Sequence, residues 1–152
     1  MKVAIACDHG GYLLKPVLTD YLEKNKIEYV DFGTDGTQSV DYPDYALPAA
    51  ECVARGECDF GILICGTGIG MSIAANKVNG IRCALCHDVF SAKATRNHND
   101  ANMIAFGARV IGAGLMLEIV DAFLHASFDG GRHVARIEKI RGIERKYRGE
   151  YR

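Results

Sequence analysis

Short apolar runs rich in valine and isoleucine alternate with helical patterns along the chain. Five such runs occur, at residues 3–7, 27–32, 60–65, 81–86 and 103–106. Their apolar residues are continuous, which is typical of strands covered on both faces in a parallel sheet. Between the runs, apolar residues recur at helical spacing, as in Leu14, Leu18 and Leu22. This order predicts an α/β fold, a Rossmann-like three-layer α/β/α arrangement around a five-stranded parallel sheet with right-handed crossovers.

The composition is that of one globular domain. The chain has 152 residues, of which 49% are hydrophobic and 24% charged, so we treat 1–152 as a single domain with a C-terminal helical extension from 132 onward. A net charge of −1 gives no overall attraction to nucleic acid or to an anionic membrane. No apolar stretch approaches the roughly 20 residues of a membrane helix. With no export signal visible, a cytoplasmic location is expected.

Six cysteines raise the question of disulfides or a metal. A cytoplasmic chain with its own core favours reduced thiols. Cys83 and Cys86 have the spacing of a redox or zinc motif, but residues three apart on a buried strand point to opposite faces. The cysteines other than Cys65 are therefore interpreted as small buried hydrophobic residues, and no metal site is expected.

Two of the predicted strands end in polar or glycine-rich sequence. The first ends in Cys7-Asp8-His9-Gly10-Gly11, and the third ends in Cys65-Gly66-Thr67-Gly68-Ile69-Gly70. Ligands bind at the carboxyl ends of strands in open α/β sheets. Glycines let backbone N–H groups approach an anion, and the following helix start favours the thiolate form of Cys65. The spacing differs from G-x-G-x-x-G, so a dinucleotide site is only weakly indicated.

The segment 96–102 is densely polar and contains His98. We interpret it as a loop that enters a strand, although an Asn/Asp-rich turn without a catalytic role is an equal alternative for His98 alone. Such a loop lies at the opposite edge of the sheet from Cys65. If both residues act in one site, the simplest arrangement takes His98 from a neighbouring subunit. Arg132 and Arg136 share a helical face, and their two guanidinium groups can each bind a phosphate in a bidentate manner.

Taken together, these motifs are similar to ribose-5-phosphate isomerase of the B type, in a family that includes the galactose-6-phosphate isomerase subunits. The resemblance runs over essentially the whole chain, with the motifs in the same order. They are Asp8-His9-Gly10-Gly11, Asp41-Tyr42-Pro43, Ile64 to Gly70, Ala74-Ala75-Asn76-Lys77, His98 to Asn102 and Gly130-Gly131-Arg132-His133.

The resemblance implies a cofactor-free and metal-free aldose–ketose isomerase of the pentose phosphate pathway, acting on ribose 5-phosphate and ribulose 5-phosphate. It implies catalytic roles for Cys65 as the base, Thr67 beside it, and His98 in opening the sugar ring. The implied substrate-binding residues are Asp8, His9, Gly66, Gly68, Ile69, Gly70, Asn99, Arg109, Arg132 and Arg136. The family's site is shared between subunits, which implies a homodimer or a dimer of dimers.

Two features leave alternatives open. Some family members carry a glutamate as base where this chain has Met71, which cannot accept a proton, so the task falls to Cys65. Pocket length decides between five-carbon substrates and galactose 6-phosphate or allose 6-phosphate. A non-catalytic sugar-phosphate binding protein would keep the arginines without needing Cys65. The role of Tyr42 is not indicated by the pattern.

Overall fold

The computed structural model describes residues 1–147, which form one parallel five-stranded sheet with helices on both faces. The strand order is β2-β1-β3-β5-β4. The strands are β1 (Lys2–Cys7), β2 (Glu28–Asp31), β3 (Phe60–Cys65), β4 (Cys83–Leu85) and β5 (Met103–Gly107). The helices are α1 (Lys15–Lys24), α2 (Pro43–Ala54), α3 (Ile69–Ala75), α4 (Val89–Asn99), α5 (Ala113–His125) and α6 (Arg132–Tyr147), with a 3₁₀ turn at Tyr12–Leu14.

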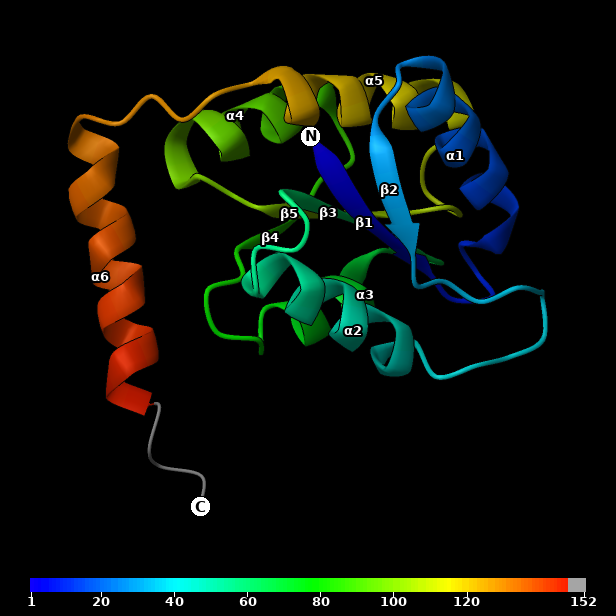
Figure 1. Cartoon of the computed structure of the whole chain (residues 1–152), viewed down its shortest axis with the longest axis horizontal. Coiled ribbons are helices and arrows are strands. Elements are labelled where there is room, and N and C mark those ends of the chain that lie inside the picture. The colour runs from blue at the N-terminus through cyan, green and yellow to red at the C-terminus, as the bar shows by residue number, and fades with distance from the viewer. Residues whose placement is uncertain (148–152) are drawn as a thin grey trace.

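The sheet is the middle of three layers, as the continuous apolar runs predicted. Helices α1, α4 and α5 cover one face, and α2 and α3 cover the other (Figure 1). Alternation along β1 explains the division, because Val3 and Ile5 pack in the first core and Ala4 and Ala6 in the second. Burial on both faces is the reason that β1, β3 and β5 contain no alternating polar residues.

The core on the α2 side is built from small residues. Ala46, Ala49 and Ala50 of α2 are fully buried against a sheet face that carries Ala4 and Ala6. Methyl groups on both sides let the α2 backbone lie close to β1. This close approach fixes where the first turn of α2 stands relative to the strand ends.

The sheet has its switch point between β1 and β3. From β1 the chain moves outward to β2, whereas β3 leads to strands on the other side. The loops after these two strands therefore border one crevice, the usual ligand position in open α/β sheets. The loop after β1 also touches the end of β3, since a Cβ atom at Gly11 would lie 2.2 Å from the Ile64 carbonyl oxygen. Only glycine fits at this contact.

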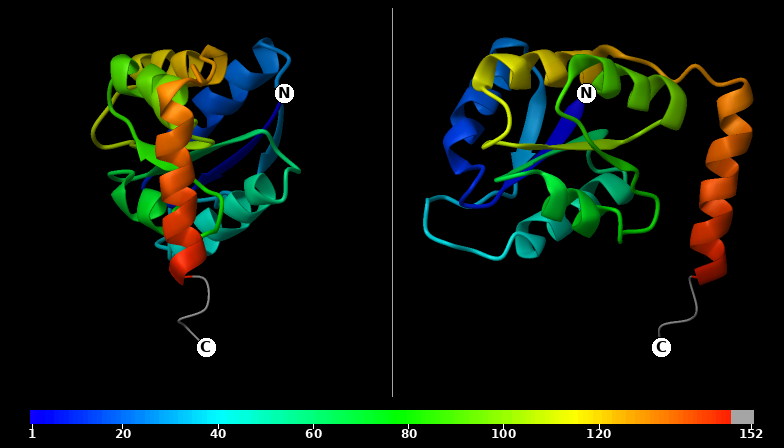
Figure 2. Two further views of the ribbon diagram at one scale, coloured as in Figure 1. Left: turned by 90° about the vertical axis from the view of Figure 1, so that its left-hand side faces the viewer. Right: turned by 180° about the vertical axis from the view of Figure 1, so that it is seen from behind.

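Helix α6 stands at one end of the molecule, away from the sheet, and the β2–α2 loop lies at the other end (Figures 1 and 2). The buried Ile137 and a hydrogen bond from the Gly80 N–H to Glu144 Oε1 (3.1 Å) link α6 to the body. The apolar residues Ile140, Ile143 and Tyr147 of the same helix are exposed. The expected extension beyond 147 lies outside the described residues. Among residues 1–147, no helix has the length and apolar character required to span a membrane.

We expect Gly11→Ala to lower the free energy of unfolding by about 1–3 kcal/mol, because the new methyl group overlaps the Ile64 carbonyl. Denaturant unfolding of the variant and the wild type measures the difference. Gly36→Ala is the control, since a Cβ atom there has no neighbour within 4 Å. Equal stability of the Gly11 and Gly36 variants would contradict the assigned contact.

Candidate active site

Cys65 is the last residue of β3 and lies at the start of the glycine loop. The loop turns sharply because Gly68 adopts a left-handed backbone with φ +77°, which a residue with a side chain rarely adopts. That turn aims the Gly68 N–H at Cys65 Sγ, at 3.0 Å. A backbone amide that donates to sulfur stabilises the thiolate form, the form that removes protons.

The loop after β1 lies against the glycine loop. The carboxylate of Asp8 accepts the N–H groups of Gly10 (2.8 Å) and Gly11 (3.1 Å), which fixes the turn. The Val40 N–H donates to Nδ1 of His9 at 3.2 Å. A neutral His9 therefore carries its proton on Nε2, where the ring can donate to a ligand. A Cβ atom at Gly10 would lie 2.9 Å from the Gly66 nitrogen, so the two loops are in contact.

Three further side chains border the glycine loop. Arg109 folds over Gly66, since a Cβ atom there would lie 3.6 Å from its guanidinium. The Ile69 N–H donates to Thr67 Oγ1 at 3.3 Å. The Tyr42 ring covers Gly70, where a Cβ atom would come within 2.7 Å of it. The sequence pattern gave no role to Tyr42, whose place at the site depends on the packing of α2.

His98 and Asn99 lie in the last turn of α4, so the expected loop at 96–102 is wrong for its first four residues. The helix continues there and ends at Asp100, whose left-handed backbone (φ +46°) reverses the chain into β5. The strand register pairs Met103 with Gly61 and Gly107 with Cys65. His98 therefore lies near the start of β3 and Cys65 at its end, as the topology predicted.

Asp100 holds this helix end in place through the buried Arg96 and the partly buried Arg82. Its carboxylate lies 3.1 Å from Nη2 of Arg82 and 2.8 Å from Nη1 of Arg96. Arg96 also donates to the Ala101 carbonyl at 2.7 Å and stacks on Phe60, 4.8 Å from the ring centroid. The sequence did not indicate a role for either arginine, because their contacts with Asp100 arise only in the folded chain.

The same end of the molecule carries the two predicted anion-binding arginines. Arg132 and Arg136 lie on the first turns of α6, and the intervening His133 stacks on His98. The predicted site residues thus form two separate groups, one at each edge of the sheet. One group is Asp8, His9, Cys65, the glycine loop and Arg109, and the other is His98, Asn99, Arg132 and Arg136.

A family model described as ribose/galactose isomerase matches residues 3–140. The chain belongs to this family. A putative sugar phosphate isomerase of Bacillus subtilis is 61% identical over 147 residues, covering 96% of this chain and 99% of that protein. Ribose-5-phosphate isomerase B of Escherichia coli is 50% identical, covering 95% of this chain and 97% of that protein.

Among solved structures, that of Clostridium thermocellum ribose-5-phosphate isomerase B is 57% identical with a TM-score of 0.95. It covers 97% of this chain and 99% of that one. The shared architecture extends over both edges of the sheet. Both edges of the sheet are therefore part of the shared fold.

The other cysteines differ from Cys65 in their surroundings. Burial raises the pKa of Cys7 from 9.0 to about 11, that of Cys58 to about 12 and that of Cys86 to about 11. Burial also raises the pKa of Cys83 far above its ordinary value. All six cysteines are free and buried, Cys65 included, with 5% of its surface exposed.

Iodoacetamide at pH 8 is expected to alkylate Cys65 before Cys7, Cys58, Cys83 or Cys86. The raised pKa of those four thiols leaves little thiolate at this pH, so they react slowly, whereas the Cys65 sulfur accepts the Gly68 N–H. Peptide mass spectrometry over a time course measures the order. Early labelling at Cys86, which also follows a strand end, would contradict the importance of the Gly68 contact.

Proposed function

We propose that this chain interconverts D-ribose 5-phosphate and D-ribulose 5-phosphate through an enediolate, with Cys65 as the base. The observation that carries the proposal is the hydrogen bond from the Gly68 N–H to Cys65 Sγ, 3.0 Å long. It lies at the edge of the sheet where the loops after β1 and β3 meet. Family membership and the names of the similar proteins supply the substrate class. A glutamate cannot act as the base at position 71 of this chain, because that residue is the fully buried Met71, whose side chain carries no basic group.

The reaction moves one proton between two carbons and a second between their two oxygens. The Cys65 thiolate takes the proton from C2 of the open-chain aldose and returns it to C1, while the hydroxyl proton on O2 passes to O1. C2 is thereby oxidised and C1 reduced within one molecule. Such a positioned base contributes about 10²–10⁴-fold to the rate. Backbone N–H groups of the loop from Gly66 to Gly70 face the developing oxyanion, together with Thr67. Donors of this kind contribute roughly 3–4 kcal/mol each. Asp8 and His9 bind the sugar from the β1 side.

The remaining steps need groups from the other edge of the sheet. His98 opens the furanose ring by proton transfer, Asn99 binds the sugar, and Arg132 and Arg136 hold the phosphate, whereas Arg109 binds the sugar from the Cys65 edge. A strand's length separates His98 from Cys65 within one chain. We therefore propose that one subunit supplies Cys65 and its partner supplies His98, in a homodimer or a dimer of dimers.

The proposed chemistry requires no redox cofactor, because the substrate is both oxidised and reduced within one molecule. A metal is not required either, since N–H donors and arginines supply the positive charge. With this substrate, the enzyme belongs in the cytoplasm, in the pentose phosphate pathway.

Incubation with ribose 5-phosphate in D₂O is expected to place deuterium on the carbon next to the carbonyl. Cys65→Ala is expected to lower kcat by at least about 10²-fold, with little change in substrate binding, because it removes only the base. NMR detects the deuterium and calorimetry the binding. Cys52→Ala, another buried cysteine, is the control and is expected to stay active. Full activity of Cys65→Ala would exclude this mechanism.

The family description also names galactose, so six-carbon substrates are the second candidate. The same assay with galactose 6-phosphate and allose 6-phosphate compares kcat/KM across chain lengths. A preference for a six-carbon sugar would change the substrate and leave the mechanism intact. Binding of all these sugars without turnover would indicate a sugar-phosphate binding protein.

Mixing inactive Cys65→Ala and inactive His98→Ala chains, with subunit exchange, is expected to restore about one quarter of the wild-type activity. Half of the dimers are then mixed, and one of the two sites in each regains both residues. Turnover before and after exchange measures the recovery. Each variant exchanged with itself is the control. If the mixture stays inactive although mass spectrometry detects mixed dimers, the shared site is wrong.

A further inference from the structure

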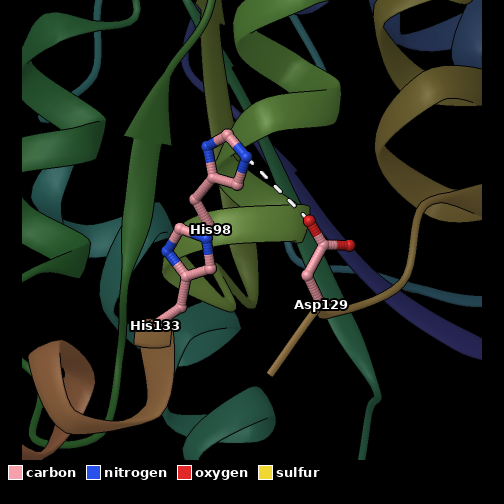
Figure 3. A group of neighbouring side chains, drawn as sticks. All are labelled: His98, Asp129 and His133. Atoms are coloured by element: carbon pink, nitrogen blue, oxygen red, sulfur yellow. Dashed lines mark ion pairs between the residues drawn. The ribbon is translucent and has the colours of Figure 1, made fainter. Parts of the chain in front are cut away.

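His98, Asp129 and His133 form a compact group of potential metal ligands (Figure 3). His98 comes from the end of α4, Asp129 from the segment that follows α5, and His133 from the first turn of α6. Nε2 of His98 lies 3.9 Å from Oδ2 of Asp129, and the two imidazole rings stack with centroids 4.6 Å apart. One ligand atom from each residue lies within 4.8 Å of the other two.

The backbone around the group is fixed by hydrogen bonds. The Asp129 N–H donates to the Asn97 carbonyl at 3.0 Å, and Asn97 Nδ2 donates to the Ser127 carbonyl at 2.6 Å and to Asp129 Oδ1 at 3.3 Å. These contacts join the segment before α6 to the end of α4, one residue from His98. The three ligands thus converge because of the fold, and not through a chance meeting of long side chains.

The side chains have the freedom to close on an ion. His133 is buried, with 8% of its surface exposed, and forms the rigid side of the group. The side chains of His98 and Asp129 are 47% and 53% exposed, so they can turn toward it. Ligand atoms around a tetrahedral ion with bonds of about 2.0 Å lie roughly 3.3 Å apart. Rotation of the two exposed side chains covers this difference.

The ligand types in the group select the kind of ion. A neutral imidazole is the form that binds metals. Mg²⁺ and Ca²⁺ require oxygen ligands, and the group offers only one carboxylate. Two imidazoles and one carboxylate suit Zn²⁺ and Co²⁺, with water in the fourth position.

We infer that His98, Asp129 and His133 bind one divalent transition-metal ion per chain, of the Zn²⁺ class, and that this ion inhibits the enzyme. The inhibitory effect rests on the proposed function, because it removes His98 from ring opening. The metal and the sugar then compete for His98, so each weakens the binding of the other.

The binding test uses the whole protein, freed of metal, and titrates it with Co²⁺. The expected result is the visible absorption of tetrahedral Co²⁺ at one ion per chain, without the near-ultraviolet band of a thiolate ligand. His133→Ala and Asp129→Asn are each expected to weaken Co²⁺ binding by at least about tenfold. Circular dichroism of the variants shows that they are folded.

His125→Ala is the matched control. His125 Nδ1 lies 3.2 Å from Asp121 Oδ1, closer than the His98–Asp129 pair, but no third ligand from residues 1–147 joins it. Its removal is expected to leave Co²⁺ binding unchanged. Mg²⁺ at the same concentration is expected to neither bind nor compete.

A Cys65→Ser variant tests the rival target, because a thiol at the glycine loop also attracts Zn²⁺. If Co²⁺ binding is lost in Cys65→Ser and kept in His133→Ala, the inference is overturned. An absence of Co²⁺ binding by the wild type overturns it as well.

The inhibition test measures isomerase activity with and without Zn²⁺. A rise in the apparent KM for the sugar phosphate is expected in the wild type, and a smaller rise in His133→Ala. Binding without this rise would refute the inhibitory effect and keep the site. A protein that binds Co²⁺ but isomerises no sugar would refute the proposed function alone, so the two failures are distinguishable.

Discussion

The parallel direction of all five strands is the constraint on which the rest of the molecule depends. It gathers the loops after β1 and β3 at one edge and sends the end of α4, which precedes β5, to the other. Because a strand of five residues separates the two edges, no side-chain rotation brings His98 to Cys65. The fold therefore separates two proposed half-sites, and we propose that association of subunits unites them.

Each half-site is held by a different kind of interaction. On the Cys65 side the contacts are made by backbone, through the Gly68 N–H and through glycines that allow two loops to touch. On the His98 side they are made by charge, since Asp100 pairs with the buried Arg96 and the partly buried Arg82. Backbone donors suit an oxyanion that forms during a reaction, whereas a charged anchor suits a helix end that must keep its position when a phosphate binds nearby.

The sequence allowed the layers, the strands and the crevice to be predicted, because burial on both faces leaves a continuous apolar pattern in β1, β3 and β5. It also placed His98 at the edge opposite Cys65, since that follows from strand direction alone. The loop predicted at 96–102 was wrong at 96–99, because these polar residues form the last turn of α4. Tyr42 and Arg96 could not be found from the pattern, since their contacts arise only when distant segments pack.

The alanine-lined contact between α2 and β1 links the interior to the proposed sugar site. Tyr42 directly precedes α2, and its ring covers Gly70. A bulkier residue at Ala46 or Ala49 would lift the helix by about the width of a methyl group and would carry the Tyr42 ring with it. An interior substitution would in this way change the space over Gly70 without itself meeting a ligand.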